Sequence, residues 1–165
     1  MSNELQVVKI GLAIVILGLI FSIGMGVSFG LNEDAFKDFV AEGIATHPQL
    51  HDEKSTDKIW RYAQRAHFHA GGVAAFSLGL IILVMFSNLR PVYKRFSSVL
   101  IGVGSLYPLA WFSMFFLAPS IGRGAAHDHF ITEMFTYIGV GGLTAGLFIL
   151  LANLFLGLFS GRVTA

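Results

Sequence analysis

The stretch AHFHAGGVAAFSLGLIILVMF, residues 66–86, decides the fold. It contains no Asp, Glu, Lys or Arg, and it is long enough to cross the hydrocarbon of a bilayer, for which a helix needs about 20 apolar residues. Three further apolar runs cover residues 10–29, 96–118 and 130–159, and the only charged residue in them is Glu133. The sequence therefore predicts four membrane-spanning helices in a single domain, residues 1–165.

The composition points the same way. Hydrophobic residues make up 55% of the chain and charged residues 13%, whereas soluble domains average about 25% charged residues. A formal net charge of +1 offers no broad basic face, so we expect no nucleic-acid partner. The absence of cysteine excludes disulfides, thiolate metal sites and cysteine nucleophiles. The expected partners are the lipid bilayer and either other membrane proteins or further copies of the chain.

Charge in the short connections predicts the orientation. Residues 88–95, between the second and third spans, carry three cations and no anion, which is typical of a cytoplasmic loop. Lys9 and Arg162 then lie on the same side, so both termini are predicted to be cytoplasmic. The connections at residues 30–65 and 119–129 are predicted to be extracytoplasmic.

The long outer connection, residues 31–60, is expected to contain a short helix that lies on the membrane surface. Asn32 can cap its start and Pro48 ends it. Ser55 is the candidate cap of a helix that continues unbroken into the second span, and Pro108 predicts a kink in the third span. The predicted fold is an all-α integral membrane four-helix bundle with this short extracytoplasmic helix between its first two spans.

Small residues recur at three- and four-residue spacing and predict close helix packing. The stripes are Gly18, Ser22 and Gly26 in the first span, Gly71, Ala75 and Gly79 in the second, and Thr132, Thr136, Gly139, Gly142 and Gly146 in the fourth. His67 lies four residues before Gly71, and His129 lies three residues before Thr132. Both histidines are therefore predicted to lie on packed faces, where they would face each other.

All six histidines of the chain fall on the outer side in this orientation. Imidazole is the common axial ligand of haem, so one interpretation is haem b held between His67 and His129. Arg65 and Arg123, with Arg61 nearby, would then meet the haem propionates.

A bare Cu, Fe or Zn ion is the alternative cofactor, because imidazole suits all three metals. Its candidate ligands are His67, His69, His127, His129 and Glu133. If the second span is a regular helix, His67 and His69 diverge by about 200° and cannot bind the same ion.

Each candidate also has a purely structural interpretation. His47 and His51 lie in the outer connection and are expected to be polar anchors bonded to a carbonyl, water or a headgroup. A carboxylate within an apolar helix is functional by default, but Glu133 could instead form an ion pair with Arg65 or Arg123.

The segment RAHFHAGG, residues 65–72, resembles the second-helix motif Arg-Ala-His-x-Asn-x-x-Glu of the MAPEG family, the small membrane glutathione transferases and eicosanoid enzymes. The first three residues match, whereas His69 takes the place of the Asn and Gly72 that of the Glu. The resemblance implies four helices with a long first loop, glutathione conjugation and a homotrimer. It also implies that the motif faces the cytosol, opposite to the orientation that the charges predict.

The leading hypothesis is an integral membrane protein that binds haem or a metal through histidines near its extracytoplasmic face. It would transfer electrons or serve as a small subunit of a membrane redox complex. The alternatives are a MAPEG-like glutathione transferase, a proton or ion pathway that uses Glu133 and the histidines, and a structural membrane subunit.

Overall fold

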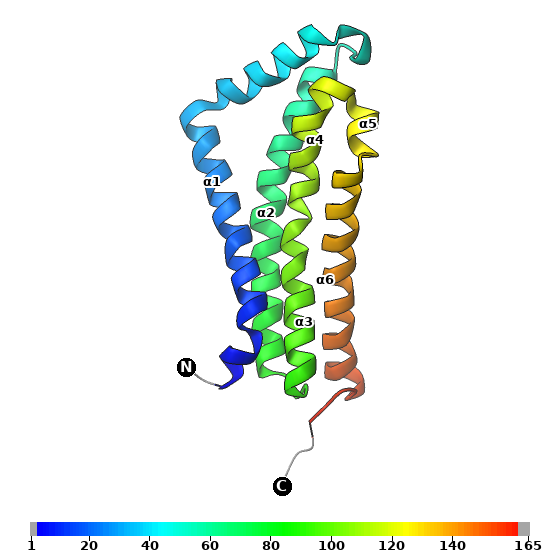
Figure 1. The fold of residues 1–165 in the computed structure, drawn as a ribbon. Coiled ribbons are helices and arrows are strands. Elements are labelled where there is room, and N and C mark those ends of the chain that lie inside the picture. Colours follow the sequence, from blue (N-terminus) through cyan, green and yellow to red (C-terminus); the bar gives the residue numbers. More distant parts are fainter. Residues whose placement is uncertain (1–2, 162–165) are drawn as a thin grey trace.

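The computed structural model of the protein describes residues 3–161, and its regular structure is helical apart from an isolated bridge between Leu89 and Ser160. The elements are α1 (Asn3–Thr46), η1 (Pro48–Leu50), α2 (Ser55–Phe86), α3 (Pro91–Val103), η2 (Gly104–Leu106), α4 (Pro108–Ile121), α5 (Arg123–His127) and α6 (Phe130–Leu156) (Figure 1). Four segments are long and apolar enough to cross a membrane, namely α1, α2, the α3–α4 segment and α6. The all-helical fold with four such segments is as predicted.

Helix α1 changes direction at Asn32, whose φ of −156° and ψ of 66° are not helical. The Asn32 side-chain oxygen accepts a hydrogen bond from the Ala35 N–H at 3.2 Å, which confirms the predicted cap. The following residues, 33–46, run across the end of the bundle (Figure 1). The helix ends at Thr46, just before Pro48, as predicted.

Three helix boundaries differ in detail from the prediction. Ser55 is the first residue of α2 rather than its cap, and its hydroxyl donates a hydrogen bond to the Asp52 carboxylate at 2.8 Å. The predicted kink at Pro108 is an interruption, in which a 3-10 turn separates α3 from α4. The fourth span was predicted to reach Phe159, but α6 ends at Leu156 because Gly157 adopts a left-handed conformation with φ of 66°.

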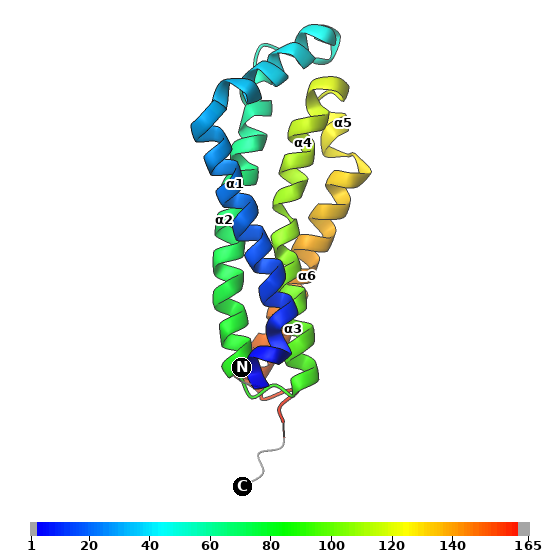
Figure 2. The ribbon, with the colours of Figure 1, turned by 60° about the vertical axis from the view of Figure 1, so that its left-hand side comes forward.

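The third span, α3 and α4, occupies the middle of the bundle (Figure 2). Helix α1 packs against α2 and α3, and α6 packs mainly against α3. Helices α2 and α6 barely touch. Helices α2 and α6 therefore lie apart, and α4 packs against both of them.

Small residues mediate this packing on α1 and α6, as predicted. A Cβ at Gly18 would lie 2.8 Å from the Ser105 side chain, and one at Gly139 would lie 2.6 Å from the Tyr107 nitrogen. The prediction for the second span is partly wrong, since Ala75 is exposed and a Cβ at Gly79 would meet no other part of the protein within 4 Å. The buried face of α2 instead follows Ala63, Ala66, Ala70 and Ala74.

Both ends of the described chain lie at the same end of the bundle, opposite residues 33–46 (Figure 1). Lys94 is buried there, and its ammonium donates to the Glu4 carboxylate at 2.6 Å and to the Met85 carbonyl at 2.8 Å. A buried ammonium needs such partners because desolvation is otherwise costly. The pair thus fixes the start of α1 to α2 and α3.

At the opposite end, an aromatic cluster fastens residues 33–46 to the bundle. The Phe36 ring lies 6.2 Å from Trp60 and 6.0 Å from Phe115, measured between ring centroids. Val40 is fully buried in the same cluster. The outer connection therefore has a packed core of its own.

Two polar contacts join the outer connection to the last turn of α4 and to Arg123, which follows it. The Arg123 guanidinium donates to the Asp52 carboxylate at 2.7 Å, and His51 Nε2 donates to the Pro119 carbonyl at 3.0 Å. The Ser55 hydroxyl and the Arg123 guanidinium hold the pKa of the Asp52 carboxyl below its usual value.

The ion pair between Asp52 and Arg123 is expected to be lost in acid. The folded state lowers the pKa of Asp52. The ionised carboxylate therefore contributes fully to the stability of the fold at pH values above the usual pKa of an Asp side chain. This contribution disappears as the pH falls through the lowered pKa. Asp52→Asn should reproduce the acid effect at neutral pH. Hydrogen exchange at residues 47–55 measures both changes, and equal protection in the variant and the wild type would contradict the assignment.

Candidate functional site

Side chains from three successive turns of α2 pack against the indole of Trp111 on α4. Tyr62 lies 5.9 Å from the indole between ring centroids, the Arg65 guanidinium lies 4.7 Å from the ring centroid, and His69 lies 5.7 Å away. These α2 residues share one helical face because they are spaced by three and four positions. Tyr107 extends the group, with its ring 5.5 Å from His69.

His69 has a defined tautomer within this group. Its Nδ1 lies 2.8 Å from the Arg65 carbonyl, which can only accept, so Nδ1 carries the proton. In the neutral ring, Nε2 then carries a lone pair. His69 can therefore act as a hydrogen-bond acceptor or a ligand through Nε2.

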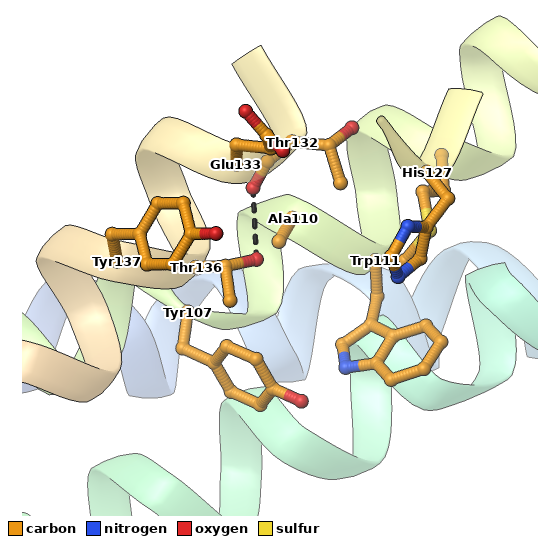
Figure 3. A pocket seen from close by; sticks show the side chains of 9 residues that line it. Tyr107, Ala110, Trp111, His127, Thr132, Glu133, Thr136 and Tyr137 are labelled. Atoms are coloured by element: carbon orange, nitrogen blue, oxygen red, sulfur yellow. Dashed lines mark hydrogen bonds between the residues drawn. The ribbon is translucent and has the colours of Figure 1, made fainter. Parts of the chain in front are cut away.

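A cavity of about 170 Å³ opens beside Trp111, between α4 and α6. It is lined by Tyr107, Ala110, Trp111, Met114, His127, Thr132, Glu133, Thr136 and Tyr137. Figure 3 shows Tyr107, Thr136 and Tyr137 at one end of this space, with Trp111 and His127 at the other. The lining combines aromatic rings with hydroxyl, imidazole and carboxyl groups, and it includes two of the predicted site residues, His127 and Glu133.

Two titratable side chains of the lining, Glu133 and His127, lie at the rim of the cavity. Glu133 is exposed in the first turn of α6, where the helix dipole favours a carboxylate. Among residues 3–161 no salt bridge reaches it, so the ion pair with Arg65 or Arg123 is not formed. His127 is exposed, and its Nδ1 lies 2.7 Å from Asp128.

The indole N–H of Trp111 is buried and has no acceptor among the described residues. A buried donor without an acceptor costs about 1–3 kcal/mol, and such groups call for an explanation. Trp111 lines the adjacent cavity, but its Nε1 atom is itself covered.

His67 lies on the other side of α2 and packs against α1. Its Nδ1 donates to the Ser22 carbonyl at 2.9 Å, and its ring lies against Gly26 and 5.8 Å from Phe29. His67 is on a packed face, as predicted, but that face is turned toward α1. The divergence of His67 from His69 is the one expected of a regular helix.

His129 caps α6, where its Nδ1 accepts a hydrogen bond from the Ile131 N–H at 3.3 Å. No hydrogen bond or ring contact in residues 3–161 joins His129 to His67. The structure therefore places the two predicted haem ligands in separate surroundings.

The other site residues that the sequence predicts also lie apart from one another. Arg123 pairs with Asp52, and Arg65 stacks on Trp111. No three His, Cys, Asp or Glu side chains in the described part of the chain are close enough to hold a metal ion. His47 and His51 bond to backbone carbonyls, in agreement with their expected structural role.

Tyr107 and Trp111, the aromatic side of the site, are not among the site residues that the sequence predicts. A signal for them exists, since both carry polar atoms within the apolar run 96–118 and lie four positions apart on one face. Comparison of the chain with protein-family models, curated proteins and solved structures gave no match in any of the three.

Proposed function

We propose that this protein is a membrane redox protein, or a small subunit of a membrane redox complex, that binds the ring of a quinone in the cavity between α4 and α6. The observation that carries the proposal is the cavity itself, which is lined by aromatic side chains and by proton-exchanging groups. Ligand sites commonly combine an apolar lining with a few placed polar groups.

The size of the cavity suits a single six-membered ring. A cavity of about 150 Å³ can hold benzene, and this one measures about 170 Å³. A haem macrocycle is much larger than one such ring. Tyr107 and Thr136 line the cavity and carry hydroxyl groups that can donate to a carbonyl oxygen of a quinone.

The rim supports the exchange of protons. Reduction of a quinone to a hydroquinone takes up two electrons and two protons, and His127 and Glu133 can each hold one proton at the rim. The electrons would come from a haem or another one-electron carrier of the redox complex. Tyr137 lines the cavity and is 71% exposed, so the proposed entrance would open toward the bilayer, where an apolar tail can remain.

We also infer that the helices span the membrane with both termini in the cytoplasm and with residues 33–46 on the outer surface. The basic connection at residues 88–95 and both ends of the described chain share one end of the bundle (Figure 1). The positive-inside rule assigns that end to the cytoplasm. The cavity and the histidines would then belong to the outer half.

Haem b is a second candidate cofactor, and the observation that favours it is the fixed tautomer of the α2 histidines. His67 and His69 both donate Nδ1–H to backbone carbonyls, the arrangement that orients an imidazole whose other nitrogen binds a metal. The expected result is a Soret band in the purified protein. This band should be lost when the histidine that binds the haem, His67 or His69, is replaced by Ala. Haem-replete expression that yields no such band would exclude this candidate.

Quinone binding is tested directly with a short-chain quinone and the purified protein in detergent. Saturable binding of one ring per chain is expected. Uptake that rises in proportion to the amount of detergent, without saturation, would show partition into the micelle alone and would contradict the proposal.

A further inference from the structure

We propose that the outer turns of α2 form a binding site for a phosphate group, separate from the cavity between α4 and α6. Lys58, Arg61, Tyr62 and Arg65 line a single hollow on this part of the helix. Their spacing of three and four residues places them on one face. The hollow thus presents three cations and a phenol to one ligand.

No salt bridge in the described part of the chain involves the cations of this hollow, although Lys58 is close enough to Asp52 to help lower the pKa of its carboxyl. Among the described residues, the salt bridges formed by Lys and Arg use Lys37, Lys94 and Arg123. Asp57 lies one turn before Arg61 but is not paired with it. Like charges on successive turns repel each other, so an anion bound between them relieves a cost that the folded chain otherwise bears.

Arg65 is already held in a suitable position. Its guanidinium lies over Trp111, 4.7 Å from the ring centroid. Stacking engages the face of the guanidinium and leaves its N–H groups, which lie in its plane, free to bind phosphate oxygens in pairs. Tyr62 also packs on Trp111, so its hydroxyl is a positioned donor beside the cations.

The position of the hollow favours a membrane lipid as the source of the phosphate. It lies immediately before the apolar run 66–86, at the level where lipid headgroups meet a spanning helix. Phe68, 69% exposed, and Phe76, 47% exposed, follow on α2 and offer an apolar surface to an acyl chain. A soluble phosphate has the same headgroup chemistry but lacks that second contact.

The test compares three probes on the full-length, delipidated protein: phosphatidylglycerol, diacylglycerol with the same acyl chains, and inorganic phosphate. Native mass spectrometry measures lipid binding, and competition measures the inorganic ion. The variants are K58Q/R61Q/R65Q and K58Q/R61Q, the second of which keeps the Arg65–Trp111 contact. The matched control is R90Q/R95Q, which removes two cations from the other end of the bundle.

Phosphatidylglycerol is expected to bind the wild type and the control variant equally, with at least a tenfold loss in the triple variant and an intermediate loss in the double variant. Diacylglycerol should bind none of them specifically. Competition by inorganic phosphate at millimolar concentration would support the phosphate site with a soluble source. Equal binding of phosphatidylglycerol to the wild type and the triple variant, or an equal loss in R90Q/R95Q, would overturn the proposal.

Discussion

Replacement of Glu133 by Leu is expected to weaken binding of a short-chain hydroquinone by at least tenfold. Glu133 lies at the rim of the cavity and has no salt-bridge partner among the described residues. Its carboxylate is therefore available to accept the ring hydroxyl. A hydrogen bond to a charged group contributes about 1.5–3 kcal/mol, and about 1.4 kcal/mol corresponds to a factor of ten in affinity.

Two further variants separate this effect from changes in folding or surface charge. Glu133→Gln keeps an acceptor but loses the charge, so it should show a smaller loss than Glu133→Leu. Glu42→Gln removes an exposed carboxylate from the helix at residues 33–46 and should bind like the wild type. Unchanged hydroquinone affinity in a correctly folded Glu133→Leu protein would remove Glu133 from the site.

Gly102→Ala is expected to destabilise the protein, although alanine is the better helix former. A Cβ at Gly102 would lie 2.7 Å from the Gly11 carbonyl oxygen and 3.1 Å from the Gly11 Cα. These are backbone atoms of α1, which cannot rotate away. Forcing extra volume into a packed contact costs about 1–3 kcal/mol, so unfolding in a denaturing detergent should begin at a lower concentration.

Gly72→Ala is the matched control, because a Cβ at Gly72 has nothing within 4 Å. There the helix propensity of alanine acts alone and is expected to stabilise α2 by up to about 1 kcal/mol. The opposite signs distinguish helix packing from propensity. If both substitutions stabilise the protein equally, α1 and α3 do not approach as described.

The fold could be predicted from the sequence because its signals are local. Long apolar runs, in which Glu133 is the only charged residue, give helices of spanning length, and Asn32 and Pro108 act on the backbone where they stand. The end of α6 was misjudged because the apolar residues continue after Gly157, while that glycine already leaves the helical conformation. Hydropathy alone does not register this change.

The candidate site was harder to predict because it depends on which neighbour each helix face meets. Small residues on α2 form more than one stripe, and the buried stripe includes Ala70 and Ala74 rather than Ala75 and Gly79. His67 was placed correctly on a packed face, but sequence periodicity does not say that α1 covers that face. Periodicity within one helix describes its faces, whereas the pairing of faces is a property of the whole bundle.

The binding of a quinone beside Trp111 is the central claim, and the fluorescence of that residue tests it most directly. The chain has two tryptophans, so Trp60→Phe leaves Trp111 as the sole tryptophan, which can be excited selectively. A short-chain quinone should quench its emission saturably, and Thr136→Phe, which fills the cavity, should abolish the saturable part. Quenching that is identical with and without Thr136→Phe, and linear in the quinone held by the micelle, would contradict a ring-binding site between α4 and α6.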